Sequence, residues 1–534
     1  MDFFALILQL ILDASASWIR MFIALGISIV ISIAVGIYAA VSPRAERVIL
    51  PVVDILQTVP ILAFFPFALY IFVVFLPGFI GINAAVIFLI VTSMVWNIIF
   101  GVYESIKTLP KEFLELSDLY QFDRMERLKS IYIPAALPRI VEQSILSWSI
   151  GLFYLVTSEI FSLGISQDQV RWGIGVAFAT LVYQGASQYV TAIVVFICFV
   201  VATRFLFFRP LEKYSVRYMR QQARVPQPAQ GYERTVIGWV SRNISRAPSV
   251  LTSNRILKGR KHVSHLPTPK TRHDLRMLYY AGLAAIMLLL IYVFATNRML
   301  LELESVVFPA IIASFVRIWF AFAVMLAIAI PLSVYLIFMS RQSSKYMIVF
   351  QIAASIPATI LLPAIAVTLK SGELVAFAVF LLSGIWYVIF SVMASTRTLP
   401  QSVFEVKKIF GVKGRSAWSN IYIKAIVPGL ITGAVTGIAA EWNASIVAEY
   451  FTNASGNLVS SVGTGLGKVL DLSLVTCKSG ASCWTAQYGL PALSGSQGLM
   501  LMGVALLNLV VMIILINTLV WKRMYRKVSK IYMG

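Results

Sequence analysis

The chain has 534 residues, of which 59% are hydrophobic and only 13% are charged, and its 44 basic and 23 acidic residues give a net charge of +21. Soluble domains are about 45–50% apolar and about 25% charged, so this composition excludes an ordinary soluble protein and indicates a membrane protein. The basic residues cluster between apolar stretches, and no aromatic and basic patch is arranged to bind bases, which argues against a nucleic-acid partner.

Apolar stretches long enough to cross a bilayer as helices, about 20 residues, recur along the whole chain. In the first half they lie at 16–41, 48–76, 82–107, 135–163 and 187–209. In the second half they lie at 276–296, 306–339, 344–369, 373–396, 425–452 and 498–521. We expect the first twelve residues to lie along the membrane surface or to extend the first helix. The pattern predicts an all-α integral membrane protein with about 11 transmembrane helices.

Lys and Arg in the short loops predict the orientation of these spans. Arg44 and Arg47 follow the first span, Arg341 and Lys345 occupy the matching turn of the second half, and the tail at 522–534 is basic. The span order puts all three on the same side of the membrane, which we assign to the cytoplasm. The chain is therefore expected to be a multi-pass protein of the plasma membrane.

A strongly basic stretch separates the two halves. Between residues 204 and 276 it holds sixteen Lys or Arg against three Asp or Glu, which is typical of a cytoplasmic linker that contacts anionic headgroups. The expected organisation is a first repeat at 1–209, the linker at 210–275, an extra span with an outer loop at 276–305, a second repeat at 306–521 and a basic cytoplasmic tail at 522–534.

The two halves of the chain form an internal sequence repeat. A shift of 297 residues places Arg20 on Arg317, and after the first outer loop a shift of 290 residues places Glu159 on Glu449. Both halves run in the same direction through the membrane in the predicted topology. Parallel repeats imply a pseudo-two-fold axis along the membrane normal, with a transport pathway at the repeat interface.

A polar segment separates the third and fourth core spans of each half. It reads LPKEFLELSDLYQFDRMERLKSIYIPAALP in the first half and LPQSVFEVKKIFGVKGRSAWSNIYIKAIVP in the second. Each begins at a proline, Pro110 or Pro400, which the first helical turn tolerates. An amphipathic helix follows, with its apolar face at Phe113, Leu116, Leu119 and Tyr120, and at Val403, Val406, Ile409 and Phe410. Two such cytoplasmic helices can seat in two equivalent grooves of a soluble partner.

These segments resemble the EAA loop of permeases from ATP-binding-cassette (ABC) importers. The loop's pattern is EAA, three residues, Gly, nine residues, Ile, one residue, Leu and Pro. The residues that fit it are Glu115, Ile131, Ile133 and Pro134 in the first half and Glu405, Gly411, Ile421 and Ile423 in the second. Gln121 replaces the glycine in the first half, Lys424 replaces the proline in the second, and neither half keeps the two alanines.

Other segments indicate which group of importer permeases the chain resembles. QTVPILAFFPFAL, ASIPATILLPAIAV, AAEWNASIVAEYF and VGTGLGKVLD are similar to the fused, two-repeat permeases of the nitrate, sulfonate, taurine and bicarbonate type. The resemblance implies a type I importer permease fold, like that of the methionine importer. It also implies a cytosolic ABC ATPase dimer and an extracytoplasmic solute-binding protein as partners.

In that family the EAA helices dock on the ATPase and transmit its closure to the spans. Carried over to this chain, the resemblance implies ATPase-coupling residues at Pro110, Glu115, Leu119, Gln121, Pro134, Pro400, Glu405, Ile409, Gly411 and Ile421. The chain has no GxxxxGK[ST] loop to hold nucleotide phosphates and no HExxH or GxSxG element, so we expect no enzyme activity. We expect no cofactor in this chain, with ATP and Mg²⁺ held by the partner subunit.

Several residues within the spans are candidates for the transport pathway or its gate. Glu159 and Glu449 are acids near the outer ends of matched helices, and they either line a cavity, anchor the repeats to each other, or cap backbone groups. Trp442 and Asn443 are candidates to line the pathway or to pack between helices. The matched prolines Pro60 and Pro357 interrupt apolar helices, where they would either form gating kinks or be tolerated without function.

The outer segment TCKSGASCW contains Cys477 and Cys483, for which we hypothesise a disulfide. No His lies near them, so we predict no metal site there. The alternative function is a secondary, ion-coupled carrier with parallel repeats, which would need an acid deep in the membrane. Glu142 and Asp54 are its additional candidates, and both lie near the cytoplasmic ends of spans. The sequence does not identify the solute.

Overall fold

A computed structural model of the chain describes residues 3–58, 60–76, 78–165, 172–222, 296–336, 356–396, 414–452, 458–473, 495–521 and 523–524. This described part is helical apart from one short antiparallel hairpin, in which Tyr450 pairs with Ser461 and Phe451 with Ser460. It contains 8 helices that are long and apolar enough to cross a membrane. The expectation of an all-α membrane fold is therefore confirmed.

The first repeat consists of α1 (Phe3–Val41), α2 (Pro43–Thr58), η1 (Ile61–Phe64), α3 (Phe65–Phe75), α4 (Phe79–Lys107), α5 (Lys111–Leu119), α6 (Arg124–Arg127), η2 (Leu128–Tyr132), α7 (Ile133–Ile165), α8 (Ile174–Leu181), α9 (Ala186–Thr203), η3 (Arg204–Phe208) and α10 (Arg209–Gln222). The second repeat consists of α13 (Arg298–Val334), α15 (Ala358–Leu369), α16 (Gly372–Thr396), α18 (Gly414–Ala417), η5 (Trp418–Tyr422), α19 (Ile423–Ala448), β1 (Tyr450–Thr452), β2 (Leu458–Ser461), α20 (Leu466–Leu472), α21 (Gly495–Ile516) and η7 (Asn517–Trp521).

Several expected elements have different bounds in the structure. The helix expected from residue 306 begins at Arg298, within the expected outer loop, and α10 continues to Gln222, within the expected linker. The first twelve residues extend the first helix, because α1 runs unbroken over 39 residues. The expected span at 48–76 is divided into α2, η1 and α3, since Pro60 has extended backbone angles (φ −60°, ψ 111°) and begins a new helical segment. Except for its last residue, the expected extra span at 276–296 lies outside the described residues.

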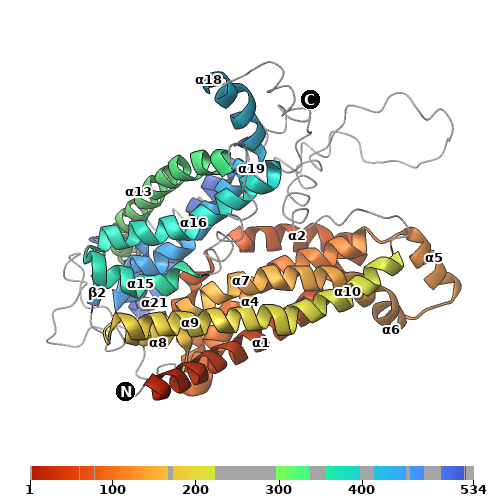
Figure 1. Cartoon of the computed structure of the whole chain (residues 1–534), viewed down its shortest axis with the longest axis horizontal. Helices are drawn as coiled ribbons and strands as arrows, with labels where there is room; N and C mark the ends of the chain where they lie inside the picture. Colours follow the sequence, from red (N-terminus) through yellow and green to blue (C-terminus); the bar gives the residue numbers. More distant parts are fainter. Residues whose placement is uncertain are drawn as a thin grey trace.

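The two repeats pack in the same way. In the first, α4 lies between α1 and α7, and in the second α16 packs on both α13 and α19. Figure 1 shows the first repeat, red to yellow, beside the second, green to blue. Contacts between repeats are reciprocal, because α19 packs on η1 and α7 packs on α15, the two elements that follow the matched prolines. The parallel repeats predicted from the sequence are thus visible as matched packing.

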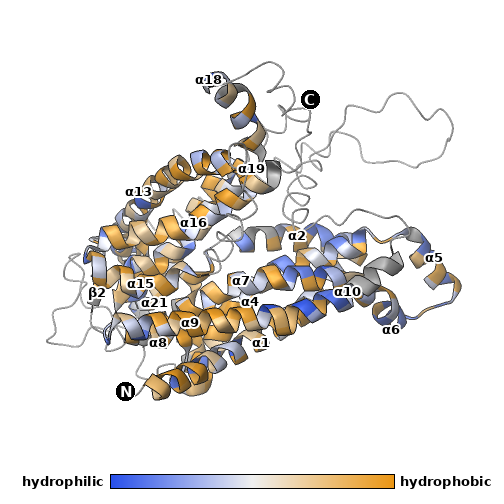
Figure 2. Ribbon diagram, viewed as in Figure 1, coloured by the Kyte–Doolittle hydropathy of each residue, from blue (hydrophilic) through white to orange (hydrophobic). Residues whose placement is uncertain are grey.

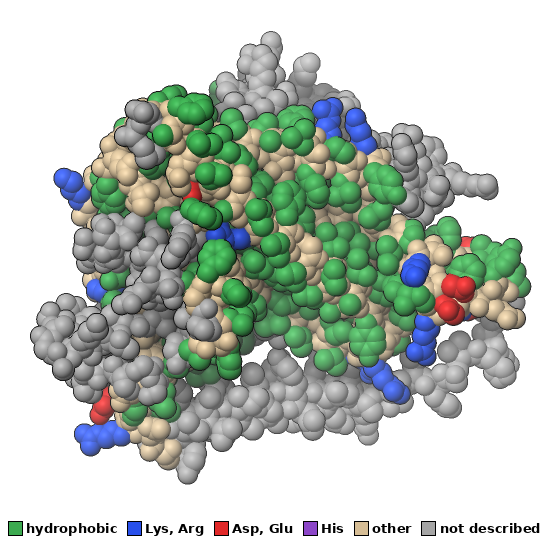
Figure 3. Space-filling model, turned by 90° about the horizontal axis from the view of Figure 1, so that it is seen from below, with side chains coloured by type: hydrophobic (Ala, Val, Ile, Leu, Met, Phe, Trp, Pro, Cys, Tyr) green, Lys and Arg blue, Asp and Glu red, His purple; other side chains and the backbone are tan. Residues whose placement is uncertain are grey.

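The surface separates into apolar and polar zones. The long helices are mostly hydrophobic, whereas α5, α6, α10 and part of α2 carry hydrophilic residues (Figure 2). Seen from below, hydrophobic side chains cover most of the middle of the molecule, and most of the visible Lys and Arg side chains lie outside this area (Figure 3). This distribution is the one expected of a protein whose middle contacts lipid and whose ends contact water.

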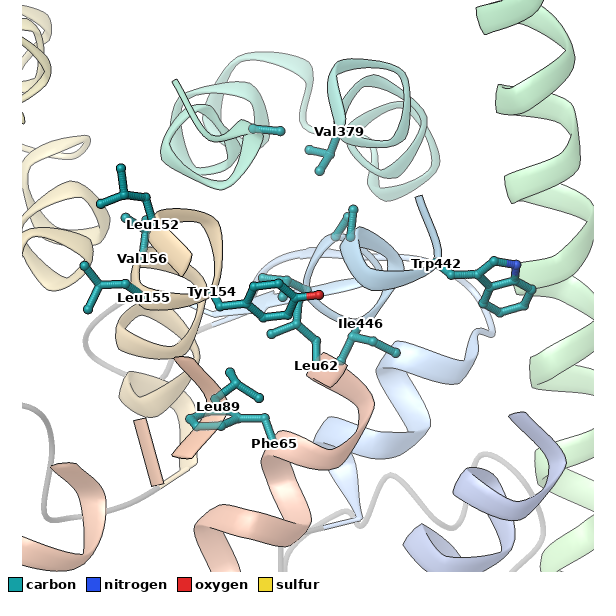
Figure 4. Packing of buried hydrophobic residues seen from close by; sticks show 14 of the residues in the cluster. Leu62, Phe65, Leu89, Leu152, Tyr154, Leu155, Val156, Val379, Trp442 and Ile446 are labelled. Atoms are coloured by element: carbon teal, nitrogen blue, oxygen red, sulfur yellow. The ribbon is translucent and has the colours of Figure 1, made fainter. Parts of the chain in front are cut away.

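Buried side chains from both repeats meet in one core (Figure 4). Leu62 and Phe65 come from the first repeat's broken span, Tyr154 comes from α7, and Ile446 comes from α19. Leu62, Phe65 and Ile446 are each at most 2% exposed, and Tyr154 is 5% exposed. The repeats are therefore joined by packed apolar side chains, in addition to the hydrogen bonds described below.

Candidate functional site: the coupling segment and the repeat anchors

The polar segment of the first repeat forms two short helices at one end of the molecule (Figure 1). Pro110 has extended backbone angles and is the N-terminal cap of α5, and Tyr120 is its C-terminal cap. Asp123 then starts α6 with a capping box, in which its side chain accepts a hydrogen bond from the backbone N–H of Glu126 and its own N–H donates to the Glu126 carboxylate. We call residues 110–127 the coupling segment.

The coupling segment exposes apolar side chains to solvent. Leu116 is 51% exposed, Leu119 is 74% exposed, Tyr120 is 70% exposed and Met125 is 53% exposed, whereas Phe113 is half-buried. Leu116 and Leu119 lie on α5, which is not among the helices long and apolar enough to cross a membrane, whereas Met125 lies at the start of one of them. A group of exposed apolar residues on a polar protrusion is typical of a surface that binds another protein.

The turn between the two short helices is braced despite an unfavourable residue. Gln121, which stands where the EAA pattern has glycine, adopts the left-handed conformation with φ +52°. The Phe122 N–H donates to the Ser117 carbonyl over 2.9 Å, and Arg127 pairs with Asp118 over 2.6 Å. The pattern's glycine is therefore explained by a positive φ, which Gln121 adopts at a cost in strain.

A π-helical turn connects the coupling segment to the long helix that follows. In the first repeat this turn is η2, which runs directly into α7. In the second repeat the matched turn is η5, which runs directly into α19. The two turns begin at Leu128 and Trp418, which are 290 residues apart. A wide turn of this kind is rare and often marks a functional position, and here it occurs at the same place in both repeats.

The second copy of the coupling segment is described only in part. Pro400, Glu405, Ile409 and Gly411 lie outside the described residues, while Ile421 lies half-buried in η5. In the first copy Glu115 is exposed and Pro134 lies half-buried at the start of α7. The coupling roles of all these residues stay predictions.

At the opposite end of α7, a buried ion pair ties three helices together. Glu159 is fully buried and accepts hydrogen bonds from Arg20 over 2.7 Å, from the Ser17 hydroxyl over 2.7 Å and from the Gly175 backbone N–H over 2.8 Å. Arg20 also donates to the Trp172 carbonyl over 2.8 Å. Buried charges are tolerated when further hydrogen bonds satisfy them, as here. We call Ser17, Arg20, Glu159 and Gly175 the first anchor.

The second repeat builds the same anchor from matched residues. Glu449 accepts from Arg317 over 3.1 Å, from the Ser314 hydroxyl over 2.6 Å and from the Gly467 N–H over 2.8 Å. Arg317 likewise donates to the Thr464 carbonyl over 2.6 Å. We call Ser314, Arg317, Glu449 and Gly467 the second anchor.

The two anchors differ in the third group that each arginine contacts. The Nε of Arg20 donates to the amide oxygen of Asn83 over 2.6 Å. At the matched place Arg317 meets a carboxylate instead, donating twice to Glu373 over 2.5 and 3.0 Å. Arg317 therefore forms ion pairs with two carboxylates, whereas Arg20 forms one and has the buried Asp13 in longer-range electrostatic contact; the Glu373 side chain is 55% exposed.

Glycines make room for each anchoring carboxylate. A Cβ atom at Gly173 would lie 2.6 Å from the carboxyl carbon of Glu159, and one at Gly465 would overlap the Glu449 carboxylate. The segments GIG, from Gly173, and GLG, from Gly465, open α8 and α20. Sequence reasoning aligned the two arginines and the two glutamates but did not pair them with each other. The signal that would have done so is the recurrence of S-x-x-R, E and G-x-G in both halves.

The four pathway candidates within the long helices differ in whether their side chains contact their own repeat or the other repeat. The contacts of Glu159 and Glu449 stay within their own repeats. The Asn443 side chain reaches the other repeat, accepting from the Leu62 N–H over 3.4 Å, whereas Trp442 is buried and points toward α13 (Figure 4). A role in the transport pathway stays a prediction for all four residues.

Pro60 and Pro357 stand at the starts of matched helical segments rather than within helices. A second link between repeats lies nearby, where the Tyr189 hydroxyl donates to the Ile360 carbonyl. A gating role for the two prolines stays a prediction. Cys477 and Cys483 lie outside the described residues, so the disulfide hypothesis also stays open.

Comparison with known proteins agrees with this architecture. The family described as "Binding-protein-dependent transport system inner membrane component" matches residues 32–209 and again 327–524, one match in each repeat. The nitrate import permease protein NrtB of Leptolyngbya laminosa is 24% identical over 164 residues, which cover 31% of this chain and 53% of that protein. The bicarbonate transport system permease protein CmpB of Synechococcus elongatus is 25% identical over 150 residues, which cover 28% of this chain and 51% of that protein.

The chain thus spans about half the length of the curated relatives it matches. The two family matches, in contrast, include most of both repeats and leave out the basic linker. With its helical spans and its internal repeat, the chain belongs to the family of binding-protein-dependent transport system inner membrane components.

Proposed function

We propose that this chain is the permease subunit of an ATP-driven importer that receives a small solute from an extracytoplasmic binding protein. In this proposal a separate cytosolic ABC ATPase dimer binds ATP and Mg²⁺ and hydrolyses the nucleotide. The family of the chain supports the class of transporter. Its two repeats support a single fused chain that supplies both halves of the membrane pathway.

The exposed apolar face of the coupling segment is the observation that carries the proposal. Leu119 and Tyr120 are the most exposed of its apolar side chains, at 74% and 70%. Covering a large apolar side chain with a partner stabilises a complex by about 1.5–3 kcal/mol. The short helix α5 therefore presents a small apolar surface of the kind that fits a groove in a soluble protein.

The geometry suggests how movement at this face would reach the membrane. The coupling segment continues through η2 into α7, whose other end is held to α1 and α8 by the first anchor. A displacement of the coupling segment would therefore move these helices together. In the second repeat η5, α19 and the second anchor form the same connection. Closure of an ATPase pair would then turn the repeats against each other in a rigid-body change of access.

The names of the relatives suggest which solutes to test first. NrtB is named for nitrate import and CmpB for bicarbonate transport, so small oxyanions are the first candidates. Uptake of labelled candidates into ATP-loaded membrane vesicles can be compared between the wild type and a variant lacking residues 110–124. The proposal predicts that the variant stays in the membrane and loses ATP-dependent uptake. Undiminished uptake by that variant would contradict it.

A further inference from the structure

Glu441 in α19 is a buried acid that the anchors and the coupling segment do not use. Its side chain is 0% exposed, and within the described part of the chain neither carboxyl oxygen has a hydrogen-bond partner. It lies eight residues before the anchored Glu449. An ionised carboxylate in apolar surroundings without a partner costs several kcal/mol or more, whereas a neutral carboxyl costs much less.

The space for this carboxyl is provided by a glycine on the neighbouring helix. A Cβ atom at Gly384 in α16 would lie 3.0 Å from Oε1 of Glu441 and 2.7 Å from the sulfur of Met325 in α13. Any larger residue at position 384 would displace the carboxyl or the thioether. The carboxyl therefore sits in a closed space where α13, α16 and α19 meet.

The first repeat fills the matched space in the opposite way. Gly384 corresponds to Met94 and Glu441 corresponds to Gly151, each pair being 290 residues apart. A Cβ atom at Gly151 would overlap the methyl group of Met94. The packing of this fold is thus satisfied by a thioether from α4 in one repeat and by a carboxyl from α19 in the other. Packing alone consequently does not require an acid at position 441.

In the described parts of the neighbouring helices, no charged side chain is placed to neutralise Glu441. On α13 the nearest charged residue is Arg317, eight residues before Met325 and paired with Glu449 and Glu373. On α16 the nearest titratable residue is Tyr387, one turn beyond Gly384.

Within the described chain, the other elements that pack on α19 bring no neutralising group either: Tyr422 of η5 and Lys424 at the start of α19 lie 19 and 17 residues before Glu441. The described elements η1 and α15 contain no titratable side chain. On α20 and β1, Lys468 bonds the Val462 and Gly463 carbonyls, and Asp471 lies in electrostatic contact with Tyr450. Among the described residues no group of three metal-binding side chains includes Glu441. A proton is therefore the simplest ligand that can neutralise its carboxyl.

We infer that Glu441 is a proton-binding site in the second repeat, and that its carboxyl is neutral in the conformation described here. Removal of the proton would leave a buried, unpaired charge and would destabilise this conformation. The stability of this state therefore falls as pH rises from the ordinary range of an exposed glutamate, where only the unfolded chain loses this proton, and it levels off once the buried carboxyl ionises as well. This inference is independent of the ATPase partner and of the solute.

The test uses the purified full-length chain. Infrared spectra of the wild type at neutral pH should contain the C=O stretching band of a protonated carboxylic acid, and Glu441→Gln should lose it. Melting temperatures measured from mildly acidic to alkaline pH should fall with pH in the wild type by about 2 °C or more beyond any fall in Glu441→Gln. An unchanged infrared spectrum, or equal pH dependence in the two proteins, would overturn the inference.

The chain itself offers a control for packing. The double variant Gly384→Met/Glu441→Gly copies the pair of the first repeat, so it should melt close to the wild type at low pH and lack the additional pH dependence. Gly384→Met alone should melt at a lower temperature, because the thioether and the carboxyl would then compete for the same space. If the double variant keeps the full pH dependence of the wild type, Glu441 is not the proton site.

Discussion

The guanidinium of Arg20 lies 2.7 Å from the carboxylate of Glu159, and the matched Arg317 and Glu449 lie 3.1 Å apart in the second repeat. Both pairs are supplied with a serine hydroxyl and a glycine N–H, so the whole constellation, and not merely the ion pair, is repeated. Each anchor joins the first helix of its repeat to the end of the long helix that follows the coupling segment.

Removing the anchoring acid should destabilise the first repeat more than the second. Glu159→Ala leaves the buried Arg20 cation without its hydrogen-bonded counter-charge, with only the more distant Asp13 in electrostatic contact, which costs up to about 3–5 kcal/mol. Glu449→Ala should cost less, because Arg317 keeps Glu373 as a partner. Thermal unfolding of the purified chain measures both losses. The exposed pair of Arg298 and Glu302 provides a control, since Glu302→Ala should change stability by less than about 1 kcal/mol. Equal losses in the two anchors would contradict this account of their difference.

Gly465 lies beside the second anchor, and replacing it even with alanine should lower the stability of the chain. A Cβ atom at Gly465 would overlap the Glu449 carboxylate and lie 3.1 Å from Arg317, whereas one at Gly463 would meet open space. Gly465→Ala should therefore destabilise the chain by about 1–3 kcal/mol. Gly463→Ala, two residues away, should melt like the wild type. If the two variants melt alike, the carboxylate does not need the space that Gly465 leaves.

Replacing Gln121 with glycine, the residue that the EAA pattern has at this position, should stabilise the turn. Because its φ is +52°, glycine should relieve a strain of roughly 1–2 kcal/mol, and the β-branched Gln121→Val should increase it. The amide of Phe122, bonded to the Ser117 carbonyl, reports on this turn. Its hydrogen exchange should be slower in Gln121→Gly and faster in Gln121→Val. The opposite order would mean that the turn is not strained at Gln121.

The π-helical turn η2 should set the direction in which the coupling segment faces. Deleting Ser130 would convert the wide turn to an ordinary helix and rotate the coupling segment by about 100° about the axis of α7. We expect this deletion to abolish ATPase association while the melting temperature stays near that of the wild type. Ser130→Ala, which keeps the turn, should bind normally. Normal association of the deletion variant would show that the turn does not orient the segment.

The sequence predicted those features that repeat or that follow from hydrophobicity. Its apolar stretches predicted the helices, and the recurrence of Arg20 at Arg317 predicted the duplicated packing of the two repeats. The short helix after Pro110 was also predicted, because a proline at the first turn followed by apolar residues at helical spacing is a local signal.

The features that the sequence did not predict depend on contacts between distant residues. The pairing of Arg20 with Glu159 joins residues 139 positions apart, and periodicity carries no information about such pairs. The exchange of Met94 and Gly151 for Gly384 and Glu441 becomes apparent only when α4 and α7 are seen to pack like α16 and α19. Glu441 itself was overlooked as a buried acid, since one acid in a long apolar stretch has no local signature of burial.

The most direct test of the proposed importer is recovery of its ATPase. The full-length chain is affinity-purified from native membranes, and bound proteins are identified for the wild type, for Leu116→Glu/Leu119→Glu and for Tyr183→Glu. Tyr183 is 48% exposed and follows the end of α8 by two residues, and it serves as the control because α8 lies far from α5 and α6 (Figure 1). We predict that an ABC ATPase subunit accompanies the wild type and Tyr183→Glu and is lost from the double variant. A wild-type chain that carries no ATPase, yet moves solute in liposomes along an ion gradient, would contradict the proposal and favour a secondary carrier.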